Sequence, residues 1–120
     1  MAKVLIVDDS PTETYKLANI LERNGFSVLS ADSGEQGLNL ARDEQPDVVL
    51  MDIVMPGLNG FQATRQLSRG KETKHIPVII VTAKNQQADQ VWGERQGAKA
   101  YLVKPIDEKQ LVSAITSVLN

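Results

Sequence analysis

Short apolar runs alternate with longer amphipathic stretches from one end of the chain to the other. Such alternation is typical of βαβ units, in which parallel strands form a buried sheet and the connecting helices cover both of its faces. We therefore predict an α/β fold with a doubly wound, five-stranded parallel sheet. The strands are expected at residues 3–8, 27–31, 47–51, 77–81 and 99–103.

Capping patterns mark where the helices between these strands begin. A capping residue followed three positions later by glutamate or glutamine can satisfy two free backbone N–H groups at a helix start. The pattern occurs at residues 10–13, 33–36 and 107–110 and, in a weaker version, at 59–62. In the first of these we expect Glu13 to reach back to Ser10, with Pro11 at the first helical position. Gly25 and Gly97 are placed to end the first and fourth helices, where a left-handed backbone favours glycine.

Length and composition indicate one globular domain. Of the 120 residues, 42% are hydrophobic and 23% charged, which is close to ordinary globular usage. We expect a single domain over residues 1–120 without an output domain, because the last apolar stripe ends one residue before Asn120. No apolar run is long enough to cross a membrane, and the first is too short for a signal peptide.

Charge and cysteine content narrow the classes of partner. The net charge is −2 with both signs interspersed, so neither a nucleic-acid-binding stripe nor a membrane-binding basic helix is indicated. Cysteine is absent, which excludes disulfide and thiolate–zinc frameworks and fits a cytoplasmic protein. Proteins or small phosphates are therefore the expected partners.

Polar side chains close or directly follow four of the five predicted strands. They are Asp8, Asp9, Asp52, Thr82 and Lys104. In an open parallel sheet the carboxyl ends of the strands share one edge, and ligands bind outside that edge. Each residue taken singly is an ordinary turn, strand-end or surface residue, but together they are expected to meet at one site.

The chemistry of these residues indicates phosphoryl transfer. Three crowded carboxylates repel one another unless a cation joins them, and Mg²⁺ is a hard cation that prefers oxygen ligands. The ammonium of Lys104 would add positive charge. A carboxylate can attack phosphorus and form an aspartyl phosphate. The residues alone do not decide which aspartate is the nucleophile.

These motifs resemble the receiver domains of two-component response regulators. Residues 4–10 (VLIVDDS) are similar to the opening acidic pair of that family, and residues 49–60 (VLMDIVMPGLNG) to its phosphoacceptor segment. Residues 81–83 (VTA) and the Lys104–Pro105 pair complete the set. The likeness covers essentially the whole chain and implies a flavodoxin-like, CheY-like (βα)₅ fold.

The resemblance implies a role for each residue at the acidic end of the sheet. Asp52 matches the phosphorylated aspartate. Asp9, Asp52 and the backbone carbonyl of Val54 match the direct Mg²⁺ ligands, and Asp8 matches a pocket acid that acts through water. Lys104 matches the lysine that contacts the phosphoryl group.

The resemblance also implies a switch rather than an enzyme. Thr82 matches the hydroxyl that contacts the phosphoryl group, and Tyr101 matches the aromatic residue that responds to it. A CheA-like histidine kinase would be the phosphodonor. A downstream protein would bind the face formed by the fourth helix, fifth strand and fifth helix.

Three further stretches look like the single-domain regulators of type IV pilus twitching motility, the PilH kind. They are residues 10–13, 55–67 and 91–98. This likeness implies a stand-alone receiver that signals by binding proteins or drains phosphate from a kinase. The lifetime of the phosphate is left open, because Val54 is apolar and Lys84 cationic where many relatives carry polar or acidic groups.

Two other α/β classes are alternatives. A haloacid-dehalogenase-like phosphohydrolase also uses a strand-end aspartate and Mg²⁺, but it needs a second aspartate two positions after the nucleophile. Ser10 and Pro11 stand at that spacing from Asp8 and Asp9. A flavodoxin-like cofactor module needs a hydroxyl- and glycine-rich phosphate loop, where this acidic pair would repel a phosphate.

Overall fold

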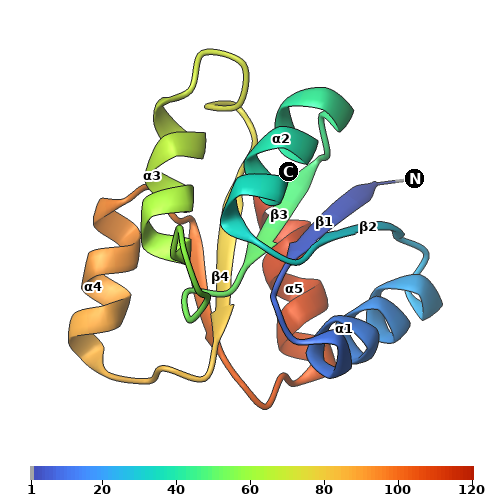
Figure 1. The fold of residues 1–120 in the computed structure, drawn as a ribbon. Coiled ribbons are helices and arrows are strands. Elements are labelled where there is room, and N and C mark those ends of the chain that lie inside the picture. Colours follow the sequence, from blue (N-terminus) through green and yellow to red (C-terminus); the bar gives the residue numbers. More distant parts are fainter. Residues whose placement is uncertain (1) are drawn as a thin grey trace.

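Five strands alternate with five helices in the computed structural model, which describes residues 2–120 (Figure 1). The strands are β1 (Lys3–Val7), β2 (Ser27–Ala31), β3 (Val48–Met51), β4 (Val78–Thr82) and β5 (Ala100–Val103). The helices are α1 (Pro11–Arg23), α2 (Gly34–Glu44), α3 (Gly60–Arg69), α4 (Gln87–Arg95) and α5 (Glu108–Leu119). Among the described residues, no helix combines the length and the apolar character needed to cross a membrane.

The strands form one parallel sheet in the order β2-β1-β3-β4-β5. This order confirms the predicted doubly wound fold. The sequence runs outward from β1 in one direction to β2 and in the other to β3, so the switch point lies between β1 and β3. Val7 is paired with Met51 across these two strands. The register therefore brings Asp8 and Asp52, the residues that follow this pair, to the same edge of the sheet.

Helices cover both faces of the sheet, because alternate residues of each buried strand point to opposite sides. One face packs against α1 and α5, and the other packs against α2 and α3. A smaller cluster of Ile53, Ile80 and Ala98 packs with Phe61 and Tyr101. Figure 1 shows α1 and α5 together on one side of the sheet and α3 and α4 on the other.

Strand boundaries agree with the prediction to within one residue, and the differences have local causes. β4 begins after Pro77, which has no N–H to donate to the sheet. It extends one residue beyond the predicted end, because the carbonyl of Thr82 accepts the N–H of Lys104 at 2.8 Å. Thr82 is thus the last residue of the strand rather than the first residue after it.

The four predicted N-caps are confirmed, but among the described residues the reciprocal bond of a capping box forms at only one of them. Side chains of Ser10, Ser33, Asn59 and Asp107 each accept a backbone N–H three residues later. The pattern at Asn59, expected to be the weaker one, is a complete capping box. The patterns at Ser10 and Ser33 are not complete, because the N–H of Ser10 donates to Asp8 Oδ1 at 2.9 Å and Oε1 of Gln36 accepts the N–H of Asp32 at 2.8 Å. Glu13 therefore does not reach back as predicted. At Asp107 only the N-cap bond from the N–H of Gln110 is formed.

Gly25 and Gly97 follow the ends of α1 and α4, as predicted. Both have a left-handed backbone, with φ of 88° and 111°. A side chain at either position would be strained, because L residues rarely adopt this conformation. The two glycines set where the chain turns back toward β2 and β5.

Candidate functional site

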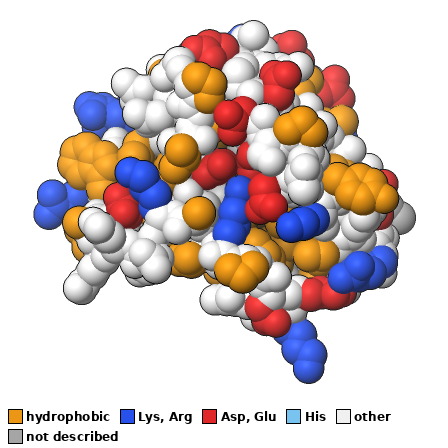
Figure 2. Space-filling model, turned by 60° about the horizontal axis from the view of Figure 1, so that its bottom comes forward, with side chains coloured by type: hydrophobic (Ala, Val, Ile, Leu, Met, Phe, Trp, Pro, Cys, Tyr) orange, Lys and Arg blue, Asp and Glu red, His pale blue; other side chains and the backbone are white. Residues whose placement is uncertain are grey.

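Three aspartates gather at the carboxyl end of the central strands. Asp8 and Asp9 follow β1 and Asp52 follows β3, and one carboxylate oxygen of each lies within 4.8 Å of the others. Asp8 and Asp52 are buried, whereas Asp9 is exposed. The N–H of Asp52 donates to the carbonyl of Val7 at 2.9 Å, which fixes the two strand ends against each other. Figure 2 shows acidic side chains around a basic one at the centre of this face.

Lys104 supplies the positive charge from the end of β5. Its Nζ lies 2.7 Å from Asp8 Oδ2 and 3.5 Å from Asp52 Oδ2. The lysine side chain is only 12% exposed. Burial lowers the pKa of Lys104, but the hydrogen bond with Asp8 and the charges of Asp52, Asp8 and Glu13 outweigh it, so the pKa is raised. The ammonium is therefore charged at neutral pH. Its peptide bond to Pro105 is cis.

Backbone donors fix the other oxygen of each buried carboxylate. The N–H of Ser10 binds Asp8 Oδ1 at 2.9 Å, and the N–H of Val54 lies 3.3 Å from Asp52 Oδ1. Each buried aspartate thus has one oxygen facing a main-chain donor and one facing the ammonium. The role expected for the carbonyl of Val54 as a metal ligand stays a prediction.

Thr82 and Tyr101 meet at the backbone of Lys84. The hydroxyl of Thr82 is buried and accepts the N–H of Lys84 at 3.4 Å, while the hydroxyl of Tyr101 donates to the carbonyl of Lys84 at 2.8 Å. Among residues 2–120, no hydrogen bond joins Thr82 to the carboxylate cluster. Burial, with smaller contributions from the charges of Asp89 and Asp52, raises the pKa of Tyr101 to about 12.

Close packing at Gly60 shapes the acceptor loop. A Cβ on Gly60 would lie 2.1 Å from the carbonyl oxygen of Asp52, which is far inside contact distance. Gly60 is the first residue of α3, and its missing side chain lets the helix approach the backbone of the aspartate. Gly57, in the same loop, does have a positive φ of 72°.

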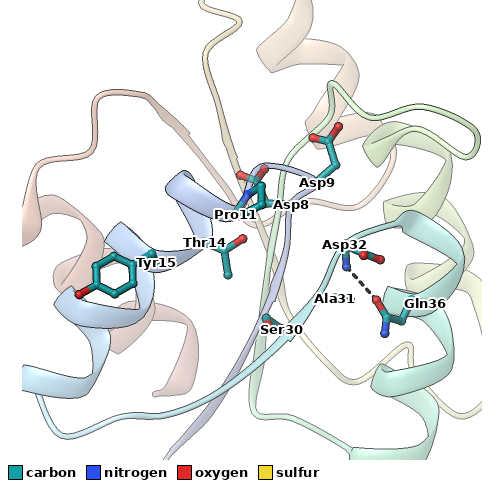
Figure 3. Close-up of a pocket in the computed structure, with 9 residues that line it drawn as sticks. All are labelled: Asp8, Asp9, Pro11, Thr14, Tyr15, Ser30, Ala31, Asp32 and Gln36. Atoms are coloured by element: carbon teal, nitrogen blue, oxygen red, sulfur yellow. Dashed lines mark hydrogen bonds between the residues drawn. The ribbon is translucent and has the colours of Figure 1, made fainter.

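Two cavities open beside the carboxylate cluster. One, of about 310 Å³, is lined by Asp9, Ile53, Val54, Met55, Pro56 and Lys84. The other, of about 530 Å³, lies between α1 and α2 (Figure 3). In it, Asp8 and Asp9 come from the β1 end, and Tyr15 lies on α1. The acidic cluster is therefore reachable from both sides of Asp9.

Sequence reasoning missed Glu13 as a residue of this site. Its Oε1 lies 3.5 Å from Nζ of Lys104, and its Oε2 lies 3.5 Å from Nζ of Lys16. The capping pattern had predicted that the side chain of Glu13 binds the backbone N–H of Ser10. Glu13 lies one turn after the acidic pair, on the first helix. This position in the sequence was the signal that its side chain lies near the same edge of the sheet.

The arrangement fits a hard divalent cation. The three aspartates offer only oxygen ligands, which is the donor set that Mg²⁺ prefers. The ammonium of Lys104 does not by itself balance three carboxylates, so a further positive charge would be favoured between them. The structure thus brings together Asp8, Asp9, Asp52 and Lys104, with Thr82 at the adjacent strand end.

Comparisons of sequence agree with this geometry. A family model described as the response regulator receiver domain matches residues 4–116. Protein PilH of Pseudomonas aeruginosa is 65% identical over 119 residues, covering 99% of this chain and 98% of PilH. The transcriptional regulatory protein CpxR of Escherichia coli is 40% identical over 120 residues, and the chain spans 50% of its length.

Solved structures give the same result. The chemotaxis protein CheY4 of Vibrio cholerae superposes with a TM-score of 0.92 at 30% identity, covering 99% of both chains. A receiver domain of a sensor histidine kinase from Pseudomonas aeruginosa PAO1 has a TM-score of 0.91 at 27% identity, covering 98% of this chain and 97% of that one. That domain was solved with a magnesium ion coordinated in its active-site cleft.

Proposed function

The chain belongs to the response regulator receiver domain family, and we propose that Asp52 is the carboxylate that accepts the phosphoryl group from a histidine kinase. The assignment of Asp52 as the acceptor rests on the groups around its carboxylate. One of its oxygens faces the N–H of Val54, and the other lies 3.5 Å from the ammonium of Lys104. Asp8 is held more tightly by Lys104, at 2.7 Å, which leaves its carboxylate less free to attack.

The carboxylates of Asp9 and Asp52 and the carbonyl of Val54 would hold Mg²⁺ directly, with Asp8 bound through water. When bound, the ion would offset the repulsion between the attacking carboxylate and the incoming phosphoryl group. Support for this assignment comes from the three clustered carboxylates of this chain.

In the proposed transfer, an oxygen of Asp52 forms a P–O bond as the P–N bond of a phosphohistidine breaks. The histidine nitrogen keeps the electron pair of the broken bond and takes up a proton. Lys104 neutralises charge on the equatorial phosphoryl oxygens, and its ammonium already lies 3.5 Å from Asp52 Oδ2. The product is an aspartyl phosphate that water later hydrolyses.

Thr82 and Tyr101 would transmit the change. We propose that the hydroxyl of Thr82 leaves the N–H of Lys84 to contact the phosphoryl group, and that Tyr101 then fills the vacated space. This shift would bias a pre-existing equilibrium of the face formed by α4, β5 and α5. Val91 and Trp92 are exposed on α4, as expected for a surface that binds a downstream protein.

The biological setting proposed is type IV pilus or related motility control. The likeness to PilH over 98% of its length supports a stand-alone receiver, which would act by binding other proteins or by draining phosphate from a CheA-like kinase. The haloacid-dehalogenase-like alternative is not favoured, because the receiver family model covers residues 4–116.

A direct test is incubation with acetyl phosphate and Mg²⁺ followed by intact-mass measurement. We expect the mass of one phosphoryl group to be added to the wild-type protein. Asp52→Asn and an excess of chelator should each abolish the addition. Steady turnover of unrelated phosphate esters without a stable adduct would instead support a phosphohydrolase.

A further inference from the structure

Lys104 has a third carboxylate neighbour that is not one of the clustered aspartates. Its Nζ lies 3.5 Å from Oε1 of Glu13, as close as it lies to Asp52. The side chain of Glu13 is 30% exposed, so the contact is only partly screened by solvent. Lys16, one turn further along α1, contacts the other oxygen of Glu13 at 3.5 Å. A chain of alternating charges therefore runs from α1 into the site.

Helix capping does not account for the direction of this side chain. The pattern at the start of α1 would place the carboxylate of Glu13 on the N–H of Ser10. That N–H already donates to Asp8 Oδ1 at 2.9 Å. Glu13 is free of the capping role and lies against Lys104 instead.

We propose that Glu13 is a positioning residue that restrains Lys104 and thereby slows phosphoryl transfer to Asp52. The inference rests on the proposed function, because it concerns the same lysine and the same acceptor. Asp8 and Asp52 belong to the carboxylate cluster that would bind the cation. Once a divalent cation neutralises these two, they attract the ammonium less. Glu13 is then the carboxylate that still competes with an incoming phosphoryl oxygen for Lys104.

The same charge favours cation binding. Glu13 draws part of the ammonium's charge away from the aspartates, and its own negative charge adds to the field at the cluster. Its removal should therefore weaken Mg²⁺ binding while it speeds the transfer at saturating Mg²⁺. Effects of opposite sign on binding and on rate distinguish this role from a loss of folding, which would impair both.

The experiment uses Glu13→Gln, which keeps the size of the side chain and removes its charge. With acetyl phosphate at saturating Mg²⁺, we expect the phosphorylation rate constant to rise about two- to fivefold, the range that one partly exposed ion pair supports. The Mg²⁺ dissociation constant, measured by NMR titration of the Val54 amide, should rise as well. Glu22→Gln, an exposed glutamate of the same helix, is the matched control and should change neither.

A double-mutant cycle with Lys104→Met tests whether the effect passes through the lysine. In the slower Lys104→Met background, Glu13→Gln should leave the rate constant unchanged, because the residue it restrains is gone. A rate rise that persists in this background overturns the inference, and so does an unchanged rate in the wild-type background. If the wild-type protein accepts no phosphoryl group, the proposed function itself fails, which is a separate result.

Discussion

At the residue scale, the site is defined by an imbalance of charge. Asp8 and Asp52 are buried carboxylates, and Lys104 is the ammonium that contacts both. Burying a charge without a partner is costly, so the lysine makes the fold compatible with the acids. It does not neutralise all three aspartates, and this residual negative charge is what favours a divalent cation.

Replacement of Lys104 by methionine tests how far the lysine compensates the buried carboxylates. The ion pair with Asp8 is part-buried, with side-chain exposures of 12% for Lys104 and 2% for Asp8. Removing one partner of a buried pair costs about 3 kcal/mol, because the remaining charge is left uncompensated. We expect the free energy of unfolding of Lys104→Met, measured by urea titration in chelator, to fall by about this amount.

Addition of Mg²⁺ supplies the second half of this test. Saturating Mg²⁺ should raise the stability of Lys104→Met more than that of the wild-type protein, because the ion replaces the missing positive charge. Lys99→Met, an exposed lysine just before β5, is the control and should behave as wild type. Equal Mg²⁺ stabilisation of the wild type and Lys104→Met would contradict the charge balance described here.

At the element scale, the loop between β4 and α4 links the site to the surface. The carbonyl of Lys84 accepts the hydroxyl of Tyr101, and the N–H of Lys84 donates to the hydroxyl of Thr82. A movement of either side chain therefore changes the contacts of the residue that both of them bind. Gly93 on α4 packs closely against Tyr101, because a Cβ there would lie 3.3 Å from its ring. The strand end, the loop and the helix are thus in direct contact.

Thr82→Ala should accept phosphate but fail to transmit it. With the hydroxyl gone, the phosphoryl group has no partner at the end of β4, and the space beside Tyr101 is open whether or not Asp52 is phosphorylated. We expect the NMR shift of the indole N–H of Trp92 on phosphorylation to be lost in Thr82→Ala. Trp92 is the only tryptophan of the chain and lies on α4.

A buried threonine elsewhere provides the matched control. Thr64 on α3 is fully buried, and its hydroxyl has no hydrogen-bond partner among the described residues. Thr64→Ala should therefore keep the wild-type response of Trp92. A full wild-type shift in phosphorylated Thr82→Ala would rule out the proposed coupling.

A second contact between elements joins the end of α1 to the start of α5 by hydrogen bonds. Glu108 accepts hydrogen bonds from Arg23, with 3.1 Å from Nε to Oε2, and from Asn24 at 2.9 Å. These bonds lower the pKa of Glu108 to about 2 from its ordinary 4.5. A carboxyl group with a depressed pKa stabilises the fold above the ordinary pKa, and this contribution is lost as pH falls through the folded value.

The pH dependence of Glu108→Gln tests this contact. The wild type should be more stable than Glu108→Gln near neutral pH, and the difference should shrink as pH falls from about 4.5 toward about 2. Urea midpoints of both proteins across that range measure it. Glu94→Gln, an exposed glutamate of α4, should track the wild type throughout. A stability difference that does not vary with pH would mean that the charge of Glu108 is not involved.

At the scale of the whole molecule, the sequence predicted the fold and the convergence of the site. Strands buried on both faces leave runs of apolar residues, and the polar residues that follow them must lie at one edge of a parallel sheet. Asp8, Asp9, Asp52, Thr82 and Lys104 were predicted to meet on this basis. The three aspartates and Lys104 do meet, whereas the described hydrogen bonds join the Thr82 hydroxyl to the backbone of Lys84 and not to the carboxylates.

What escaped prediction depends on the direction of single side chains and on close packing. Glu13 was assigned to a cap because the local pattern permits it, and only the tertiary fold brings Lys104 within its reach. Gly60 lets α3 approach the backbone of Asp52, and no such role was predicted for it from the sequence. Contacts between residues distant in the sequence decide both cases, and no local pattern encodes them.

The most direct measurement of the central claim is the position of the phosphoryl group. Protein treated with acetyl phosphate and Mg²⁺ can be reduced with borohydride, which converts an aspartyl phosphate to homoserine, and the altered residue can be located by peptide mass spectrometry. We expect homoserine at position 52 and an unaltered acidic pair at 8 and 9. Homoserine at either of those positions, or at none, would contradict the assignment of Asp52 as the acceptor.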